Sequence, residues 1–197
     1  MKKLTGIITV LCLPILLLGQ DVNGKLSEAE SNYQSQDLEG TRFALQQSLT
    51  ELDILVGQEI LKLLPASLAG NSYNEEDDSM VGGAMGFSGV FVKRSYPGET
   101  KSVEIELVTD SPYLSVLSTF LTNPLLARAG GANQKVIKVD NYKGKLTKDE
   151  NEPNKYELQI PIDQSLFSIR YEGFSSEGEV TAVANQIGIS AVANLLR

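Results

Sequence analysis

The sequence predicts an α+β fold: a mostly antiparallel sheet of five or six strands with helices on one face, preceded by an N-terminal helical hairpin. Between residues 37 and 65, apolar side chains recur at spacings of three and four, which is typical of an amphipathic helix. Between residues 90 and 107, and again between 136 and 171, apolar and polar side chains alternate as they do in half-buried strands. These patterns divide the chain into a helical part, residues 21–66, and an α+β sandwich domain, residues 67–197.

Residues 1–20 have the layout of a secretory signal peptide. Lys2 and Lys3 precede an apolar run from Ile7 to Leu18, and Gly19-Gln20 follows it. The run is too short to span a bilayer comfortably. We therefore expect cleavage after Gly19 or Gln20 and a periplasmic or secreted mature protein; an uncleaved anchor is the alternative.

The composition excludes several functional classes. The sequence has no histidine, no tryptophan and one cysteine, Cys12, which lies inside the expected signal peptide. The mature chain would therefore lack disulfides, the usual zinc ligands, and the cysteine or Ser-His-Asp nucleophiles of many hydrolases. With 17 basic and 25 acidic residues, the chain also lacks the basic footprint that nucleic acid binding requires. We expect no cofactor, no bound transition metal and no nucleic acid partner.

Two helices are expected in residues 21–66. Ser27 to Glu30 fits a capping box for the first helix, and Asp37 can cap a longer second helix that Pro65 ends. The apolar stripe of the second helix consists of Leu45, Leu49, Leu52, Val56, Ile60 and Leu63.

The second helix carries more apolar side chains than one stripe. Phe43, Ile54, Leu55 and Leu61 lie off the line from Leu45 to Leu63. Two helices alone cannot bury so wide a surface, so the sheet domain, a second copy or another protein must cover it. We expect a protein partner or self-association through the hairpin, and we expect residues 67–197 to fold without it.

The passage from residue 66 to 81 reads as an acidic linker. Its run Glu75 to Asp78 allows calcium binding or a solvated loop, although the spacing of a calcium loop is missing. The glycines that follow, Gly82, Gly83 and Gly86, allow a phosphate loop or a flexible lead-in, but no helix N-terminus is expected after them.

The best-specified unit runs from Gly82 to Ala129. Pro97-Gly98 predicts a tight turn between two strands, 90–92 and 103–107. Ser111-Pro112 then predicts the start of a helix, which we expect to cover the dry face of the hairpin.

The remaining chain predicts four more strands and two closing helices. Strands are expected at 136–139, 142–146, 156–162 and 167–171, and helices after Ser175 or Ser176 and after Gly188. Six lysines fall between Lys135 and Lys155. They indicate either a docking face for anionic envelope material or an edge strand protected against aggregation.

Two resemblances add to these patterns. The first rests on Leu64-Pro65, Gly82 to Gly86, Tyr96, Asp110 to Pro112, Asn123-Pro124, Gly130, Ile187 to Ile189 and Leu195. Through these residues the stretch 60–197 resembles an uncharacterised family of exported proteins of Gram-negative bacteria, although Asn71 to Tyr73 stand where that family usually has a tryptophan. This resemblance implies export and brings no known activity or site. In the helical part, the residues Ala29, Tyr33, Asp37-Leu38 and Ala44 make the pair loosely similar to one tetratricopeptide-type hairpin. A plain amphipathic hairpin is the alternative, and no second copy follows.

These observations favour a non-enzymatic periplasmic protein that binds or scaffolds envelope components. No residue stands out as catalytic. The alternative is a carboxylate-dependent hydrolase of the glycosidase type, which needs no histidine. However, the acids best placed by the pattern, Glu104, Glu106 and Glu157, are expected on wet strand faces rather than in a cleft.

Overall fold

The computed structural model describes residues 21–83, 89–123, 125, 131 and 133–197. The expected signal peptide and Gly86 lie outside the described residues. The helices are α1 (Val22–Gln34), α2 (Leu38–Leu63), α3 (Leu114–Thr122), α5 (Glu177–Ala184) and α6 (Ile189–Leu195), with a 3₁₀ turn, η1, at Glu75–Asp77. The strands are β1 (Ser67–Leu68), β2 (Asn71–Ser72), β3 (Ser79–Gly82), β4 (Val90–Tyr96), β5 (Ser102–Thr109), β6 (Gln134–Val139), β7 (Tyr142–Lys148), β8 (Lys155–Ile162) and β9 (Ser165–Glu172).

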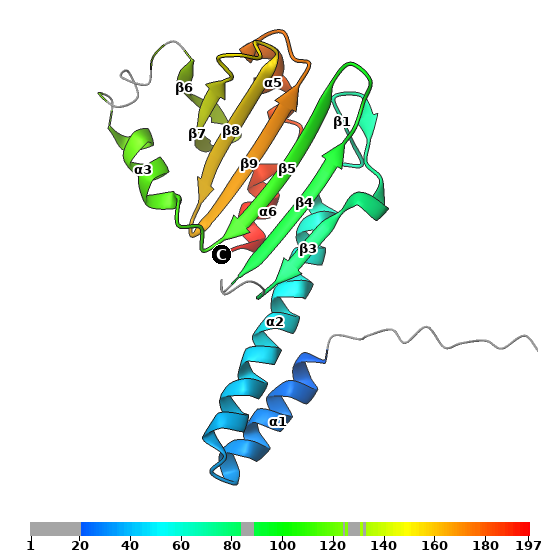
Figure 1. The fold of residues 1–197 in the computed structure, drawn as a ribbon, viewed down its shortest axis with the longest axis vertical. Coiled ribbons are helices and arrows are strands. Elements are labelled where there is room, and N and C mark those ends of the chain that lie inside the picture. Colours follow the sequence, from blue (N-terminus) through cyan, green and yellow to red (C-terminus); the bar gives the residue numbers. More distant parts are fainter. Residues whose placement is uncertain (1–20, 84–88, 124, 126–130, 132) are drawn as a thin grey trace, which may run out of the picture.

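The fold is α+β with an N-terminal helical pair and a large antiparallel sheet (Figure 1). The sheet has seven strands, in the order β3-β4-β5-β9-β8-β7-β6, rather than the five or six that the sequence predicts. The strand of this sheet that sequence reasoning missed is β3, which pairs with β4 from Ser79↔Lys93 to Gly82↔Val90. Its four residues, Ser-Met-Val-Gly, show no apolar alternation, so only pairing with β4 defines it as a strand. The short pair β1 and β2, which forms a separate two-stranded sheet, was not predicted either.

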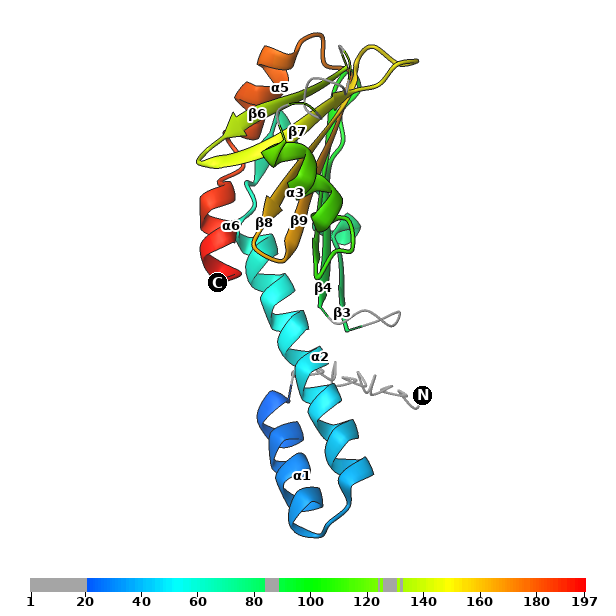
Figure 2. The same ribbon diagram turned by 90° about the vertical axis from the view of Figure 1, so that its left-hand side faces the viewer.

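The rear face of the sheet holds the core. Alternate residues of β4, β5, β9 and β8 are buried there, as the alternation predicts. The central pairing is β5 with β9, in which Ile105 lies opposite Ile169 and Leu107 opposite Phe167. Figure 2 shows α5, α6 and the upper half of α2 on this side of the sheet. Val180, Ile189 and Val192 from the closing helices complete the core.

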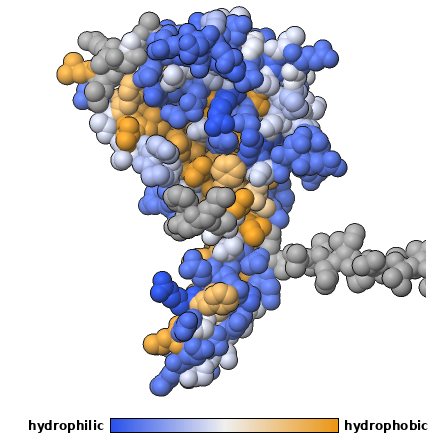
Figure 3. All heavy atoms as spheres, viewed as in Figure 1, coloured by the Kyte–Doolittle hydropathy of each residue, from blue (hydrophilic) through white to orange (hydrophobic). Residues whose placement is uncertain are grey.

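Helix α3 lies on the other face, contrary to the expectation that helices cover only one face. Its Phe120 ring is 5.3 Å from the Lys145 ammonium, whereas the neighbouring Leu146 is buried in the rear core. Successive strand residues point to opposite faces, so α3 packs on the front. Helix α3 packs there against β7 and β8. The front face is not wholly polar, because one row of paired residues across it is apolar (Figure 3). That row consists of the paired residues Phe91, Val108, Leu166 and Pro161.

The upper half of α2 belongs to the core of the sheet domain. Ile60 and Leu64 are buried among the strand residues. Glycine permits the close approach: a Cβ on Gly57 would lie 2.5 Å from the Met80 sulfur, and one on Gly82 would lie 2.9 Å from the Thr50 carbonyl oxygen. The core therefore crosses the domain boundary that the sequence analysis places at residue 66.

The expected acidic linker is ordered around a buried arginine. Arg94 lies on the rear face of β4, and its guanidinium donates from Nε and Nη2 to the Asp78 carboxylate, with Nε–Oδ1 at 2.9 Å. Only 5% of the Arg94 side chain and 8% of the Asp78 side chain are exposed. The guanidinium carbon also lies 3.7 Å from the centre of the Tyr73 ring.

The same guanidinium closes the C-terminal end of α2. Its Nη1 donates to the Leu61 carbonyl oxygen at 2.8 Å and, at 3.5 Å, to that of Leu64. The last carbonyls of a helix have no partner within the helix and carry partial negative charge, so a cation there is stabilising. Two residues later on the same face, the Tyr96 hydroxyl donates to the Pro65 carbonyl at 2.8 Å, and burial raises the pKa of Tyr96 to about 12.

Replacing Asp78 with alanine should destabilise the protein by about 3 kcal/mol, because Arg94 keeps its buried charge and loses the carboxylate. Urea denaturation at pH 7 measures the change. Lys25→Ala, which removes an exposed pair with Glu28 at 2.9 Å, should stay within about 0.5 kcal/mol of wild type. Equal effects of the two substitutions would show that the buried pair has no special role.

A fragment of residues 67–197 should fail to fold cooperatively, whereas residues 53–197 should fold. The shorter fragment loses Ile60 and Leu64 from the core and both carbonyl partners of Arg94, whereas the longer one keeps them. Thermal unfolding followed by circular dichroism distinguishes the two. A sigmoidal unfolding transition of residues 67–197 would contradict this prediction and show that the sheet domain folds independently from residue 67 onward.

Candidate functional site: the projecting helical hairpin

The hairpin of α1 and the lower half of α2 is well formed locally. Asp21 and Asp37 cap the two helices by accepting the backbone N–H of Gly24 at 2.7 Å and of Gly40 at 2.9 Å. The Asp37 cap confirms the sequence-based prediction. The predicted capping box at Ser27 is wrong, because Asp21 starts α1 six residues earlier and the Ser27 hydroxyl donates to the Asn23 carbonyl inside the helix.

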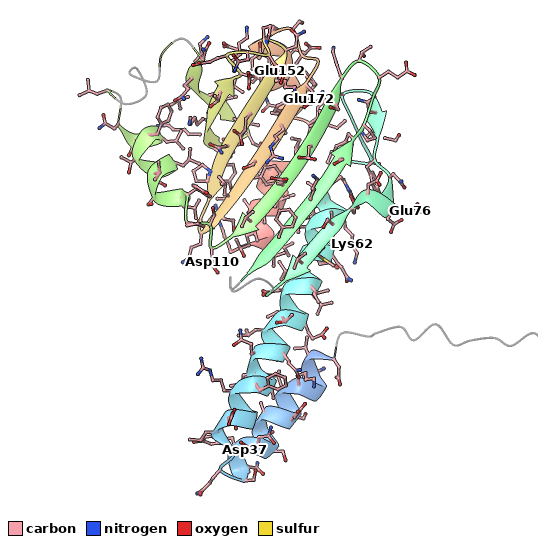
Figure 4. The ribbon with its side chains drawn as sticks, in the orientation of Figure 1. Asp37, Lys62, Glu76, Asp110, Glu152 and Glu172 are labelled. Atoms are coloured by element: carbon pink, nitrogen blue, oxygen red, sulfur yellow. The ribbon has the colours of Figure 1, made fainter. Side chains whose placement is uncertain are left out.

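The hairpin projects away from the sheet. Figure 4 places Asp37 at the far end of the hairpin and Lys62 beside the sheet, so α2 reaches from the tip into the body of the protein. Figure 2 shows α1 packed only on the lower half of α2. Small side chains make this contact, since Ala29 and Ala44 are buried and the Ser48 hydroxyl lies 3.5 Å from the Val22 carbonyl oxygen.

One side of α2 is left uncovered. An α-helix turns by about 100° per residue, so α2 presents Ala44 and Ser48 to α1 and turns Gly57 and Ile60 toward the sheet. Between these faces runs a line of apolar side chains that we call the leucine stripe. Its five leucines have between 39% and 67% of their surface exposed. The leucine stripe consists of Leu38, Leu45, Leu49, Leu52, Val56 and Leu63.

The apolar stripe of α2 predicted from the sequence is not buried as one unit in the structure. Of that stripe, Ile60 is fully buried by the sheet and Val56 is half-buried against the core, while the leucines remain exposed. Of the four residues off the stripe, Ile54 and Leu61 are half-buried, and Phe43 and Leu55 are exposed. The sheet covers one part of the wide surface and leaves another part uncovered.

The charged residues that could support a carboxylate mechanism form ion pairs on the open front face. Arg170 donates from Nη1 to Glu104 at 2.6 Å and from Nη2 to Glu106 at 3.0 Å, and Lys93 lies 2.5 Å from Glu104. Burial alone raises the pKa of the Glu104 carboxyl, but Lys93 and Arg170 outweigh it and hold that pKa below its usual value. Glu157 lies opposite Arg170 in the register and accepts from the Gln159 amide at 3.2 Å.

Asp53 behaves differently from the front-face acids. Burial raises the pKa of this carboxyl, the backbone N–H of Gly89 lowers it, and the charge of Asp110 raises it further. Asp53 belongs to α2, next to the Cβ position of Gly82, and so lies at the junction of hairpin and sheet rather than beside Glu104.

The other segments singled out in the sequence have structural roles. Asp78 turns inward to Arg94, whereas Glu75 to Asp77 form η1, and no group of three or more acids in the described ranges is placed to hold a metal ion. Gly82 ends β3, and the N–H of Gly83 donates to the Gly89 carbonyl at 2.9 Å.

The lysine-rich segment contains an edge of the sheet. Lys135 and Lys138 lie on β6, the last strand in the sheet order, which is the position where lysine discourages pairing with other chains. Lys135 pairs with Glu177 at 2.8 Å, and Lys155 pairs with Glu152 at 2.8 Å and Glu172 at 3.2 Å. Lys155, Glu152 and Glu172 border a hollow of about 470 Å³ at the upper rim of the sheet, where Figure 4 shows the two glutamates.

Comparison with known proteins assigns no family to this fold. No family model matches the sequence, and neither the curated proteins nor the solved structures provide a match. Within the part of the chain that the structure describes, no helix combines the length and apolar character needed to cross a membrane.

Acid should weaken the protein partly through Glu104. Because its folded pKa lies below 4.5, its contribution to stability is present above pH 4.5 and is lost as pH falls through the folded value. Glu104→Gln should therefore lower the urea midpoint at pH 7 and reduce its further loss on acidification to pH 3.5. Glu76→Gln, on the exposed η1 turn, should show the same acid sensitivity as wild type. An unchanged pH dependence in Glu104→Gln would contradict the assigned role of the ion pairs.

Proposed function

We propose that this chain is a non-enzymatic protein of the periplasm or the exterior that binds or scaffolds envelope components by docking a protein on its projecting hairpin. The localisation in this proposal depends on the layout of residues 1–20. The binding role depends on the leucine stripe.

The leucine stripe is the observation that carries the proposal. Soluble proteins expose single leucines routinely, but a contiguous line of them rimmed by polar residues marks an interaction site. Here five leucines lie on one side of one helix, between the face that packs on α1 and the face that packs on the sheet. One continuous helix, α2 from Leu38 to Leu63, carries all five.

The body of the protein holds the hairpin as a rigid projection. The close contacts at Gly57 and Gly82 fix α2 against β3 and β4, and Arg94 closes the end of the helix. A stripe presented on a helix that is already ordered loses little conformational entropy on binding. This arrangement suits a docking element better than a flexible tail would.

The hydrolase alternative finds less support in the same geometry. A glycosidase needs one carboxyl with a raised pKa to act as the acid, paired with a second carboxylate across a cleft. Glu104 has a lowered pKa, and both Glu104 and Glu106 are held by Arg170 on an open sheet face. Asp53, whose pKa is raised, belongs to the α2 junction instead.

Site-specific crosslinking in the native cell tests the proposed function. A photo-crosslinking residue at Leu49 should capture a defined protein, whether a second copy or another chain, because Leu49 lies in the middle of the stripe. The same residue at Glu30, an exposed position on α1, should give no such product. Absence of a Leu49-specific product would overturn the docking role of the hairpin.

A further inference from the structure

The leucine stripe continues into a complete coiled-coil seam when its charged neighbours are included. From Leu38 to Leu63 the residues of this side of α2 are spaced by four and three in strict alternation. This is the heptad spacing that keeps one helix face against a partner helix. Every member is exposed except the half-buried Val56. The seam consists of Leu38, Arg42, Leu45, Leu49, Leu52, Val56, Glu59 and Leu63.

The seam is symmetric about its own midpoint, between Thr50 and Glu51. In a twofold contact, residue i meets residue j and j meets i, so an antiparallel copy of α2 reverses the order of residues about that midpoint. Reversal of this seam places apolar residues on apolar ones and the cation on the anion. The resulting pairs are Leu49 with Leu52, Leu45 with Val56, Leu38 with Leu63, and Arg42 with Glu59.

The charges select the antiparallel orientation. A parallel, in-register pair would set Arg42 against the Arg42 of the other copy and Glu59 against its Glu59, and like charges across an interface are unfavourable. The antiparallel pair instead gives two opposite-charge contacts, one on each side of the apolar layers. Glu59 already lies 2.6 Å from Lys62 on its own helix, but both side chains are more than half exposed. An exposed ion pair contributes little free energy, so it does not prevent Glu59 from pairing with Arg42 of the second copy.

We infer that the occupant of the leucine stripe is a second copy of this chain, docked antiparallel along α2. This inference rests on the proposed docking function and names its partner. In such a dimer the two helical hairpins overlap, and the two sheet domains lie at opposite ends of the paired helices. Their front faces, with the ion pairs of Arg170, stay clear of the seam because α2 packs on the rear of the sheet.

Charge reversal tests the pairing of Arg42 with Glu59. Sedimentation equilibrium should show a dimer for the wild-type protein. Arg42→Glu and Glu59→Arg should each weaken dimerisation by about tenfold or more, because each places two like-charge contacts in the dimer. The double variant Arg42→Glu/Glu59→Arg should recover the wild-type dissociation constant.

Matched controls keep this result specific to the seam. Lys143→Glu on β7 and Glu150→Arg in the following loop change the net charge by the same amounts at exposed positions of the sheet domain. Neither should alter dimerisation. A double variant no better than the single variants, or controls as damaging as the seam variants, would overturn the pairing.

Disulfide trapping tests the orientation. In protein whose Cys12 is absent or replaced by serine, Leu45→Cys and Val56→Cys chains should crosslink when mixed and not when alone. Antiparallel pairing brings position 45 to the level of position 56 in the other copy, whereas two copies of position 45 stand about 16 Å apart along the axis, beyond the reach of a disulfide. Crosslinking of each variant with itself would show a parallel pair and overturn the inference.

The oligomeric state separates this inference from the proposed function. A wild-type protein that stays monomeric at about 100 μM, which corresponds to a binding free energy weaker than roughly 5.5 kcal/mol, overturns self-docking. If the photo-crosslinking residue at position 49 nevertheless captures a different protein in the cell, the docking function stands and only the identity of the partner as a second copy is wrong. If Leu49 captures nothing, both proposals fail.

Discussion

The arrangement of this protein depends on one buried cation. Arg94 projects from the rear face of β4 and reaches three segments that are distant in sequence: the end of α2, the aromatic ring of Tyr73 and the carboxylate of Asp78. A guanidinium can serve all three because it presents several donors in a fixed plane and a flat face for stacking. Burial makes these contacts obligatory, since a charge removed from water without partners is costly. The direction in which α2 leaves the sheet is therefore fixed at this point.

Fixing α2 at its upper end determines what its lower end can do. The helix is 26 residues long, and the sheet covers only its upper half. The lower half is stabilised locally by α1, the Asp37 cap and small side chains at the helix contact. Such a contact leaves one side of α2 open, and the leucines lie on that side. The protein thus holds an apolar stripe out in solvent on a helix whose base is anchored in the core.

The two faces of the sheet have different physical characters. The rear face is apolar and packed by α2, α5 and α6, whereas the front face carries a cluster of ion pairs among Lys93, Glu104, Glu106 and Arg170. Figure 3 shows hydrophilic and hydrophobic residues side by side on that face. Cross-strand ion pairs of this kind stabilise a solvated face and set the register of the strands beneath them. They also hold Glu104 in its ionised form at neutral pH. The front face therefore carries a network of ion pairs that links neighbouring strands.

Sequence alone determined those features that depend on neighbours along the chain. The alternation in residues 90–107 and 156–171 defined strands and their buried faces, and Asp37 marked the start of α2. Pro97-Gly98 marked the end of β4, but the predicted tight turn is wrong, because residues 97–101 form a longer connection in which Gly98 does not have a positive φ. The spacing of the leucines in α2 likewise gave a line of apolar side chains. These signals are local, because helix and strand periodicity and turn chemistry act within a few residues.

The tertiary structure decided how those elements meet. The insertion of β9 between β5 and β8, the capture of Ser79–Gly82 as β3, and the pairing of Asp78 with Arg94 depend on residues far apart in sequence. The same holds for α3, which packs on the front face against β7 and β8. Which apolar residues of α2 are buried also followed from this assembly. Ile60 faced the sheet and Leu49 did not, because periodicity fixes the side of a helix on which a residue lies but not what packs against that side.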